Sequence, residues 1–442
     1  MDTIGFQWAR LAAVCIAALF AAGCGGSSPS SIPSADPGAG TASVESADSG
    51  SSKPAGGGIA TLAASGSGSA VDPSSVPGTG GGAAGAAATP PPPYTGKGPL
   101  WRTGMVAWQW KQIPSTDLGS VRPVTAVTGD PDSRINAWNG MASDALTGRL
   151  FIAGVGGHAD YAGNEAYSID LSVDAPRWRL LREPSASSDV RWNVEYYADG
   201  RPSSTHTYYA LHFVARQNRV FRVGSGSNWG SGNFGDGNTN AFNLATMDWE
   251  PAGTFGTYHS TRPVLSSAIC KHPVSEDLYA GEFRYFRRFD AGTGRWSNLA
   301  EMPDVGYPSF YPCAVDPVGN KVVIFGDNYV KPNGGIVYDI ATNKMRKITF
   351  SGAAASTMTL QEESYAWYDS ASRVFLVKTR TRDQVIRVDP TTYQATLQTT
   401  TGGGAMPDAV NGVHTRWQYL PTLGGFAYYP AAGSGIWFLA TQ

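Results

Sequence analysis

Residues 156–167 read GGHADYAGNEAY, where two glycines precede a cluster of polar and aromatic residues. Runs that can form β-strands lie on both sides: TGRLFIAG at 147–154, EAYSIDL at 165–171 and RWRLLREP at 177–184. Glycine and polar residues punctuate strands, while aromatic and β-branched residues fill them. The stretch therefore indicates a unit of short strands joined by turns.

The second strand of this unit recurs along the chain behind a similar polar turn. The copies are QNRVFRVG (217–224), SEDLYAGE (275–282), GNKVVIFG (319–326), ASRVFLVK (371–378) and LGGFAYYP (423–430). A strand-like run precedes each copy, and most are followed by a third and a fourth. Four-stranded units repeated at about this spacing predict an all-β fold, a six-bladed β-propeller.

The last unit has three strands and ends at GIWFLATQ, residues 435–442. Its missing strand is expected at the other end of the domain, where AWQWKQIP occupies 107–114. We predict that this N-terminal strand completes the sixth blade and closes the ring, which leaves no long open sheet edge.

The N-terminal quarter of the chain has a different composition. An apolar run at 11–22 is shorter than the roughly 20 residues that span a bilayer, so 1–24 is interpreted as an export signal. Residues 25–98 are almost entirely Gly, Ser, Ala, Pro and Thr, which predicts a disordered tether. The propeller is expected at 99–442.

The sequence Ala21-Ala22-Gly23-Cys24 resembles a bacterial lipobox, which implies lipidation at Cys24 and a lipid-anchored protein of the cell envelope. Gly25 in place of aspartate favours the outer membrane; the periplasmic or surface side is left open. The formal net charge is −2 and no basic run occurs, so nucleic acid is not an expected partner. We expect a monomer.

Gly156-Gly157, Tyr167 and Trp178 are similar to the kelch-repeat signature of a diglycine, a tyrosine and a tryptophan. The resemblance implies that the diglycine ends a second strand and that Tyr167 lies in the third. His158, Asp160, Tyr161, Asn164 and Glu165 would then occupy the loop between them. Loops on a rigid scaffold often carry function, so these residues are candidates to bind a sugar or hold a metal. The alternative is a loop whose polar groups satisfy one another.

Further candidates lie at the start of first strands, which line the channel of a propeller. His206, His259 and His414 are expected to converge on one mouth of the ring, with His158 if its loop opens there. A packing role for His206 is the alternative. The expected neighbours are Trp138, Tyr208, Tyr258, Arg262, Tyr311, Arg416 and Trp417.

Three functions fit such a cluster. The first is binding of a carbohydrate or another extracytoplasmic ligand at the mouth of the ring, and this is the function that we predict. The second is a uronate lyase that uses His, Tyr and Arg, similar in architecture to ulvan and oligogalacturonate lyases. The third follows Tyr258-His259-Ser260, which resembles a copper-ligating motif of galactose oxidase, although that enzyme's cross-linked cysteine has no counterpart here. Whether the protein is an enzyme, and its metal and cofactor content, are left open.

Cys270 and Cys313 lie in the predicted first strands of adjacent blades, in a domain expected to reach an oxidising compartment. Alignment of the two strands places the cysteines one residue out of register, so their side chains point to opposite faces. They then point either toward each other or away from each other. An inter-blade disulfide is possible, and the sequence leaves both orientations open.

Overall fold

The computed structural model describes residues 92–224, 226–230, 237–258, 266–282, 285–303, 310–326, 333–359 and 363–442. It divides the chain into two units, Met1–Pro77 and Gly78–Gln442, and every described residue belongs to the second. The predicted signal peptide, the lipidation site Cys24 and nearly all of the predicted tether lie outside the described residues. No helix within these ranges is long and apolar enough to cross a membrane.

Six four-stranded antiparallel sheets make up the domain; five are built from strands that follow one another in the sequence, and the sixth combines the last three strands with the first. Blade 1 contains β2 (Ala142–Asp144), β3 (Arg149–Ala153), β4 (Ala166–Asp170) and β5 (Arg179–Arg182). Blade 2 contains β6 (Leu211–Val214), β7 (Arg219–Val223), β8 (Thr239–Asn243) and β9 (Asp248–Trp249). Blade 3 contains β10 (Ala268–Lys271), β11 (Leu278–Glu282), β12 (Tyr285–Asp290) and β13 (Arg295–Asn298).

Blade 4 contains β14 (Cys313–Asp316), β15 (Lys321–Ile324), β16 (Gly334–Asp339) and β17 (Lys344–Thr349). Blade 5 contains β18 (Tyr365–Asp369), β19 (Val374–Lys378), β20 (Val385–Val388) and β21 (Ala395–Gln398). Blade 6 contains β22 (Trp417–Leu420), β23 (Gly425–Tyr428), β24 (Trp437–Ala440) and β1 (Trp110–Gln112). The short helices include α2 (Ser133–Asn136) and α3 (Ala355–Thr359).

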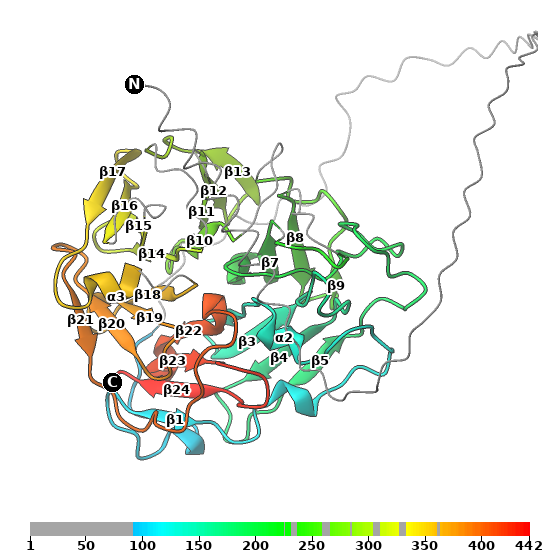
Figure 1. Cartoon of the computed structure of the whole chain (residues 1–442), viewed down its shortest axis with the longest axis horizontal. Helices are drawn as coiled ribbons and strands as arrows, with labels where there is room; N and C mark the ends of the chain where they lie inside the picture. Colours follow the sequence, from blue (N-terminus) through cyan, green and yellow to red (C-terminus); the bar gives the residue numbers. More distant parts are fainter. Residues whose placement is uncertain are drawn as a thin grey trace, which may run out of the picture. The chain divides into compact units, whose positions relative to one another are not determined.

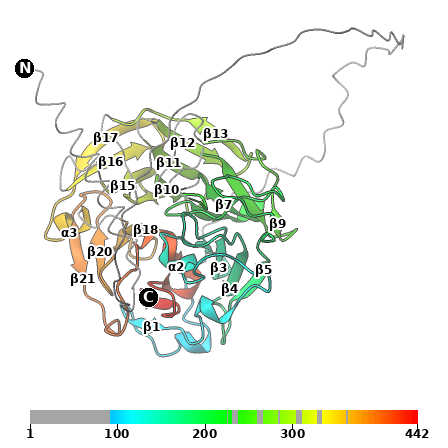
Figure 2. The same ribbon diagram turned by 45° about the vertical axis from the view of Figure 1, so that its right-hand side comes forward.

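The blades succeed one another around a ring, as the colour sequence of Figures 1 and 2 shows. The first strands of neighbouring blades contact each other, among them β2 with β6, β10 with β14, and β18 with β22. The first strands are therefore the inner strands, which confirms the predicted β-propeller.

The ring is closed by the strand nearest the N-terminus. β1 pairs antiparallel with β24, so that Trp110 lies opposite Leu439 and Gln112 opposite Trp437. The indole of Trp110 packs 5.6 Å from that of Trp417 inside blade 6. This closure confirms the prediction made from AWQWKQIP and ties the two ends of the domain together.

Most strands are buried on both faces because each blade is covered by its neighbours. In β19 the residues from Phe375 to Lys378 are buried, and all four residues of β14 are buried. Such strands show continuous apolar runs rather than strict alternation. Left-handed residues make the tight turns between them, including Asn218 (φ 51°) and Asn320 (φ 53°).

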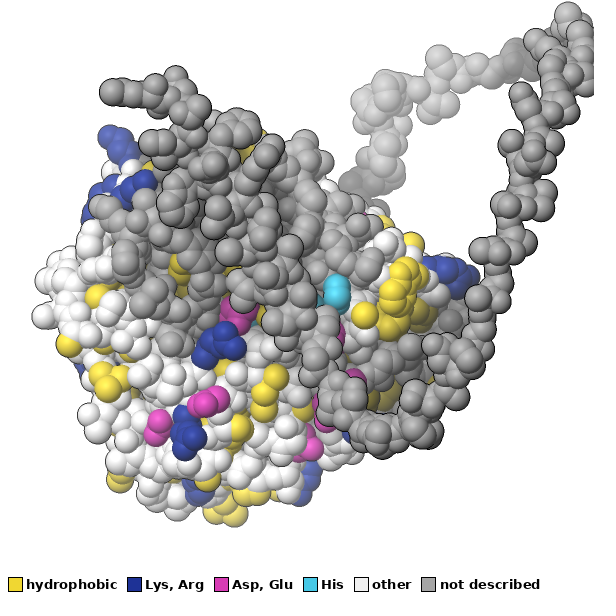
Figure 3. Space-filling model, viewed as in Figure 1, with side chains coloured by type: hydrophobic (Ala, Val, Ile, Leu, Met, Phe, Trp, Pro, Cys, Tyr) yellow, Lys and Arg dark blue, Asp and Glu magenta, His cyan; other side chains and the backbone are white. Residues whose placement is uncertain are grey.

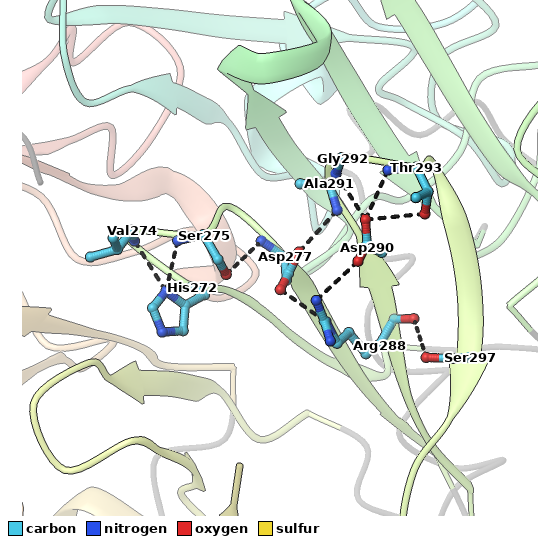
Figure 4. A network of polar contacts seen from close by, with 10 residues as sticks. All are labelled: His272, Val274, Ser275, Asp277, Arg288, Asp290, Ala291, Gly292, Thr293 and Ser297. Atoms are coloured by element: carbon cyan, nitrogen blue, oxygen red, sulfur yellow. Dashed lines mark hydrogen bonds and ion pairs between the residues drawn. The ribbon is translucent and has the colours of Figure 1, made fainter. Parts of the chain in front are cut away.

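Polar turns fix the ends of the strands. In blade 3, His272 Nδ1 accepts backbone hydrogen bonds from Val274 (3.1 Å) and Ser275 (3.0 Å) (Figure 4). The Asp277 carboxylate accepts hydrogen bonds from Arg288 Nε and from the Ala291 amide, both at 2.9 Å. These contacts join the turn after β10 to β12, on the side of the ring where the inner strands end.

A disulfide joins Cys270 of β10 to Cys313 of β14, with the two Cα atoms 5.4 Å apart. Both side chains are buried in a cluster that also contains Tyr279 and Ile324. Of the two orientations left open by the sequence, the cysteines therefore take the one in which they point toward each other. The bond links the inner strands of blades 3 and 4.

Candidate functional site

The site lies on the front face, defined here as the side of the ring on which the six inner strands begin. The GGHADYAGNEAY loop connects β3 to β4 and approaches this face through Gly157 (φ 78°). A Cβ at Gly157 would collide with the carbonyl oxygen of Ser227 and the amide of His206. Because Gly157 has no side chain, three backbone segments can meet there. The backbone amides of His158 and His206 both donate to the carbonyl oxygen of Ser227, at 3.0 and 3.2 Å.

His158 and His206 therefore come together although they lie far apart in the sequence. Their ring centroids are 5.8 Å apart. His206 is 4 % exposed, whereas His158 is only partly buried. Toward the middle of the ring, Figure 3 shows a histidine side chain near acidic and basic ones.

His206 forms the centre of a short polar chain. Its Nε2 lies 2.8 Å from Asp160 Oδ2, and its Nδ1 lies 3.5 Å from the Tyr208 hydroxyl. Burial lowers the pKa of His206 and outweighs the opposing effect of Asp160, so the ring is neutral at pH 7. A neutral ring that donates through Nε2 carries an unprotonated Nδ1, which can accept a hydrogen bond from the Tyr208 hydroxyl.

Each inner strand is preceded by a non-glycine residue with a left-handed backbone. We call these six residues the belt: Trp138 (φ 53°), Tyr208 (43°), Ser266 (53°), Phe310 (66°), Glu363 (61°) and His414 (46°). Such conformations are rare for residues with a side chain and cost on the order of 1 kcal/mol or more. Their recurrence at equivalent positions in all six blades shows that the ring itself imposes them.

Backbone hydrogen bonds between neighbouring blades hold the belt in place. The amide of one belt residue donates to the carbonyl of the belt residue in the preceding blade in four cases: Tyr208 to Trp138 (2.9 Å), Phe310 to Ser266 (3.1 Å), Glu363 to Phe310 (2.8 Å) and His414 to Glu363 (3.1 Å). The belt thus forms a rim around the front end of the channel.

Side chains of the belt also meet across the ring. Trp138 Nε1 of blade 1 donates to Glu363 Oε1 of blade 5 at 3.0 Å. The Tyr208 ring of blade 2 packs edge-on against Phe310 of blade 4 (6.0 Å) and His414 of blade 6 (5.3 Å). Contacts between blades that are not neighbours make a floor of side chains at this end of the channel.

His414 belongs to this floor and is completely buried. Its Nε2 lies 3.0 Å from the carbonyl of Asn411, and its Nδ1 has no hydrogen-bond partner within the described ranges. Burial and the neighbouring Arg416 hold the pKa of His414 well below its usual value. Three of the four predicted histidines are therefore linked, since Tyr208 contacts both His206 and His414.

Several predicted site residues have structural partners inside the fold. Glu165 is buried and accepts hydrogen bonds from the hydroxyls of Tyr161 (2.8 Å) and Tyr167 (3.0 Å). Asn164 donates to Ser185 and to the carbonyl of Pro202. Burial raises the pKa of Glu165, and also that of Tyr161, so neither group readily ionises.

Arg416 is fully buried and donates to backbone carbonyls of Ile135, Val410, Gly412 and Pro430, so it pins the segment in front of β22. Trp417 stacks on Phe426 at 4.3 Å in the core of blade 6.

Tyr258 packs 5.4 Å from Trp296, and Tyr311 lies over Gly326 in the cluster between blades 3 and 4. His259 and Arg262 lie outside the described residues.

The structure brings to the front face two charged residues that the sequence interpretation missed. Arg380 follows β19, is about half exposed, and lies 3.4 Å from Glu363 Oε2. Glu363 stands two residues before the fifth inner strand, a position similar to that of His414 in blade 6. Alignment of the residues before the six first strands is the signal that would have identified Glu363.

No family profile and no curated protein matches this sequence. Within the described ranges, no group of three or more His, Cys, Asp or Glu side chains is arranged to hold a metal ion. The arrangement on the front face offers a neutral histidine, two carboxylates, a cation and an aromatic surface to a ligand.

Proposed function

We propose that the front face of the ring binds a carbohydrate around Trp138, His206 and Asp160. The observation that carries the proposal is the arrangement of these three side chains. The Trp138 and His206 rings lie 5.1 Å apart and inclined by 33°, and His206 is hydrogen-bonded to Asp160. Sugars combine an apolar face of C–H groups with a rim of hydroxyls. An aromatic ring beside fixed donors and acceptors suits both features.

The electrostatic surroundings support an uncharged or weakly acidic sugar. The site combines Asp160 and Glu363 with Arg380, while His206 is neutral. Carboxylates that already hold a partner are oriented to accept hydrogen bonds from hydroxyls. Arg380, about half exposed, can in turn donate to a hydroxyl or to a carboxylate of the ligand.

We also propose a kelch-type origin for the blades and a lipid anchor at the cell envelope. Gly156 (φ 129°) and Gly157 (φ 78°) lie just after β3, which ends at Ala153, and Tyr167 and Trp178 are buried in blade 1. These are the structural roles that the kelch signature implies. The anchor is supported by the lipobox-like sequence before Cys24 and by Gly25, which favour the outer membrane.

A uronate lyase is the second candidate, favoured by the chain from Asp160 through His206 to Tyr208. In β-elimination a base removes the C5 proton, the C4–O bond breaks, a C4=C5 double bond forms, and an acid protonates the leaving oxygen. The unprotonated Nδ1 of neutral His206, which lies 3.5 Å from the Tyr208 hydroxyl, is a suitable base, Tyr208 is a suitable acid, and Arg380 is placed to neutralise the uronate carboxylate.

A glycan array followed by calorimetry tests the proposal. Wild-type protein should retain a carbohydrate, and His158→Ala and Asp160→Asn should each weaken binding by about tenfold, which is about 1.4 kcal/mol. The control is His272→Ala, which removes a histidine on the opposite side of the ring. Equal affinity of all three variants would contradict the proposed site. New ultraviolet absorbance from unsaturated uronate would identify the lyase.

A further inference from the structure

The most exposed tryptophan on the described surface lies beside the proposed site. Trp192, in the segment between β5 and β6, is 55 % exposed. A large exposed indole contributes little to the stability of the fold because most of its apolar area remains in water. Its position therefore calls for a different explanation.

Trp192 is held in place although it is exposed. Its ring lies 5.0 Å from that of Trp229 at 80°, and Trp229 is buried with Tyr197 and Ala162 in a small core of its own. The adjacent Asn193 donates its amide to the carbonyl of Trp229 at 2.8 Å. An aromatic ring fixed before binding loses little conformational entropy when a ligand packs on it.

Gly230 packs directly against the indole of Trp192. A Cβ at this position would lie 2.8 Å from Trp192 Cγ and would also collide with the amide of Asn193. The indole therefore lies against the glycine backbone on one side.

The same glycine connects Trp192 to the front face. Gly230 donates its amide to the carbonyl of His158 at 2.5 Å. His158 in turn lies 5.8 Å from His206, and His206 lies 5.1 Å from Trp138. Trp138, His206 and His158 are thus neighbouring rings with spacings comparable to the length of one pyranose unit, and the Gly230 backbone joins His158 to the segment that holds Trp192.

We propose that the site extends from these rings to Trp192 and takes a linear oligosaccharide rather than a single sugar. The inference rests on the proposed function. Trp138, His206 and Asp160 hold one unit, His158 contacts the next, and a further unit stacks its C–H face on Trp192. Stacking of this kind contributes on the order of 1 kcal/mol beyond the area it buries.

Chain-length dependence tests the inference. The probes are matched monomer, dimer and hexamer series of oligogalacturonate and of cello-oligosaccharide, titrated calorimetrically into the full-length protein. Wild-type protein should bind the hexamer of one series about tenfold more tightly than the monomer. Trp192→Ala should remove this gain and leave the monomer affinity unchanged, while Trp192→Phe should keep part of it.

Leu146→Ala is the matched control, since it removes a 49 % exposed apolar side chain from the turn between β2 and β3, on the opposite side of the ring. Thermal unfolding of each variant shows that the ring is intact. If Trp192→Ala leaves the hexamer affinity unchanged, or lowers monomer and hexamer affinities alike, the inference is wrong and the proposed function stands. If wild-type protein binds neither series nor any glycan of a broad array, the proposed function fails and the inference with it.

Discussion

Gly157 is the residue on which the geometry of the candidate site depends most. It lies where the backbones of the 158 loop, the segment before β6 and the segment around Ser227 meet. Its positive φ of 78° and the close approach of two backbones both exclude a side chain. The position of His158 beside His206 therefore follows from a glycine rather than from any attraction between the two rings.

Gly157→Ala should destabilise the domain by about 2 kcal/mol or more, because the new Cβ meets backbone atoms that cannot move independently. It should also weaken ligand binding, since His158 must shift. Urea unfolding and calorimetry measure the two effects. Gly404→Ala is the control, because Gly404 has open space around it and no positive φ. Equal stability of the two variants would show that the loop adapts to a side chain.

Among the structural elements, the strands were predictable and the orientation of loop side chains was not. Apolar runs such as VFLVK in β19 predict a strand, because a strand that is buried on both faces of a blade is apolar along its length. In the 158 loop, by contrast, the sequence left open whether the polar residues face a ligand or satisfy one another. Glu165 and Asn164 turn inward, where Tyr161, Tyr167 and Ser185 satisfy them.

The sequence interpretation missed Glu363 and Trp192 because backbone conformation and packing, rather than residue type, determine where these side chains lie. Glu363 reaches the site because a left-handed backbone directs it there, and a glutamate does not by itself indicate that conformation. Trp192 looks like a core residue by composition and becomes exposed only because Gly230 and Trp229 hold it at the surface. The convergence of His158 with His206 was foreseen because inner strands of a propeller begin on one side.

The disulfide is the element-level feature with the largest expected effect on stability. It links two inner strands that are 43 residues apart in the sequence. On the chain-entropy model, loss of a cross-link that closes a loop of that size lowers the free energy of unfolding by about 4 kcal/mol. The Cys270→Ala, Cys313→Ala double variant should therefore unfold at a lower denaturant concentration. Peptide mapping without reduction should recover the Cys270–Cys313 cross-linked pair; recovery of both cysteines as free thiols would disprove the bond.

At the scale of the whole molecule, buried histidines make the stability of the ring depend on pH. Burial lowers the pKa values of His206 and His414 and brings that of His212 to about 3. In the unfolded chain these rings titrate near pH 6.5. Because the folded pKa values are lower, the stabilisation is fully present above about pH 6.5 and is lost as the pH falls toward the folded values.

Each such histidine should lower the free energy of unfolding by about 1.4 kcal/mol per pH unit in this window. Glu165 acts in the opposite sense, because burial raises its pKa and the carboxyl group therefore takes up a proton when the chain folds. Because the three buried histidines outnumber this one carboxyl group, we expect a net loss of stability on acidification. Urea unfolding at about pH 7.5 and about pH 5.5 measures it, and equal or greater stability at the lower pH would contradict the assignment of neutral buried rings.

The most direct test of the carbohydrate site is a crystal structure of the protein with the oligosaccharide that it retains most tightly. We expect one sugar unit packed on Trp138 within hydrogen-bond distance of His206 or Asp160, and the chain running past His158 toward Trp192. Sugar density confined to the opposite side of the ring, where the turn around His272 lies, would contradict the account.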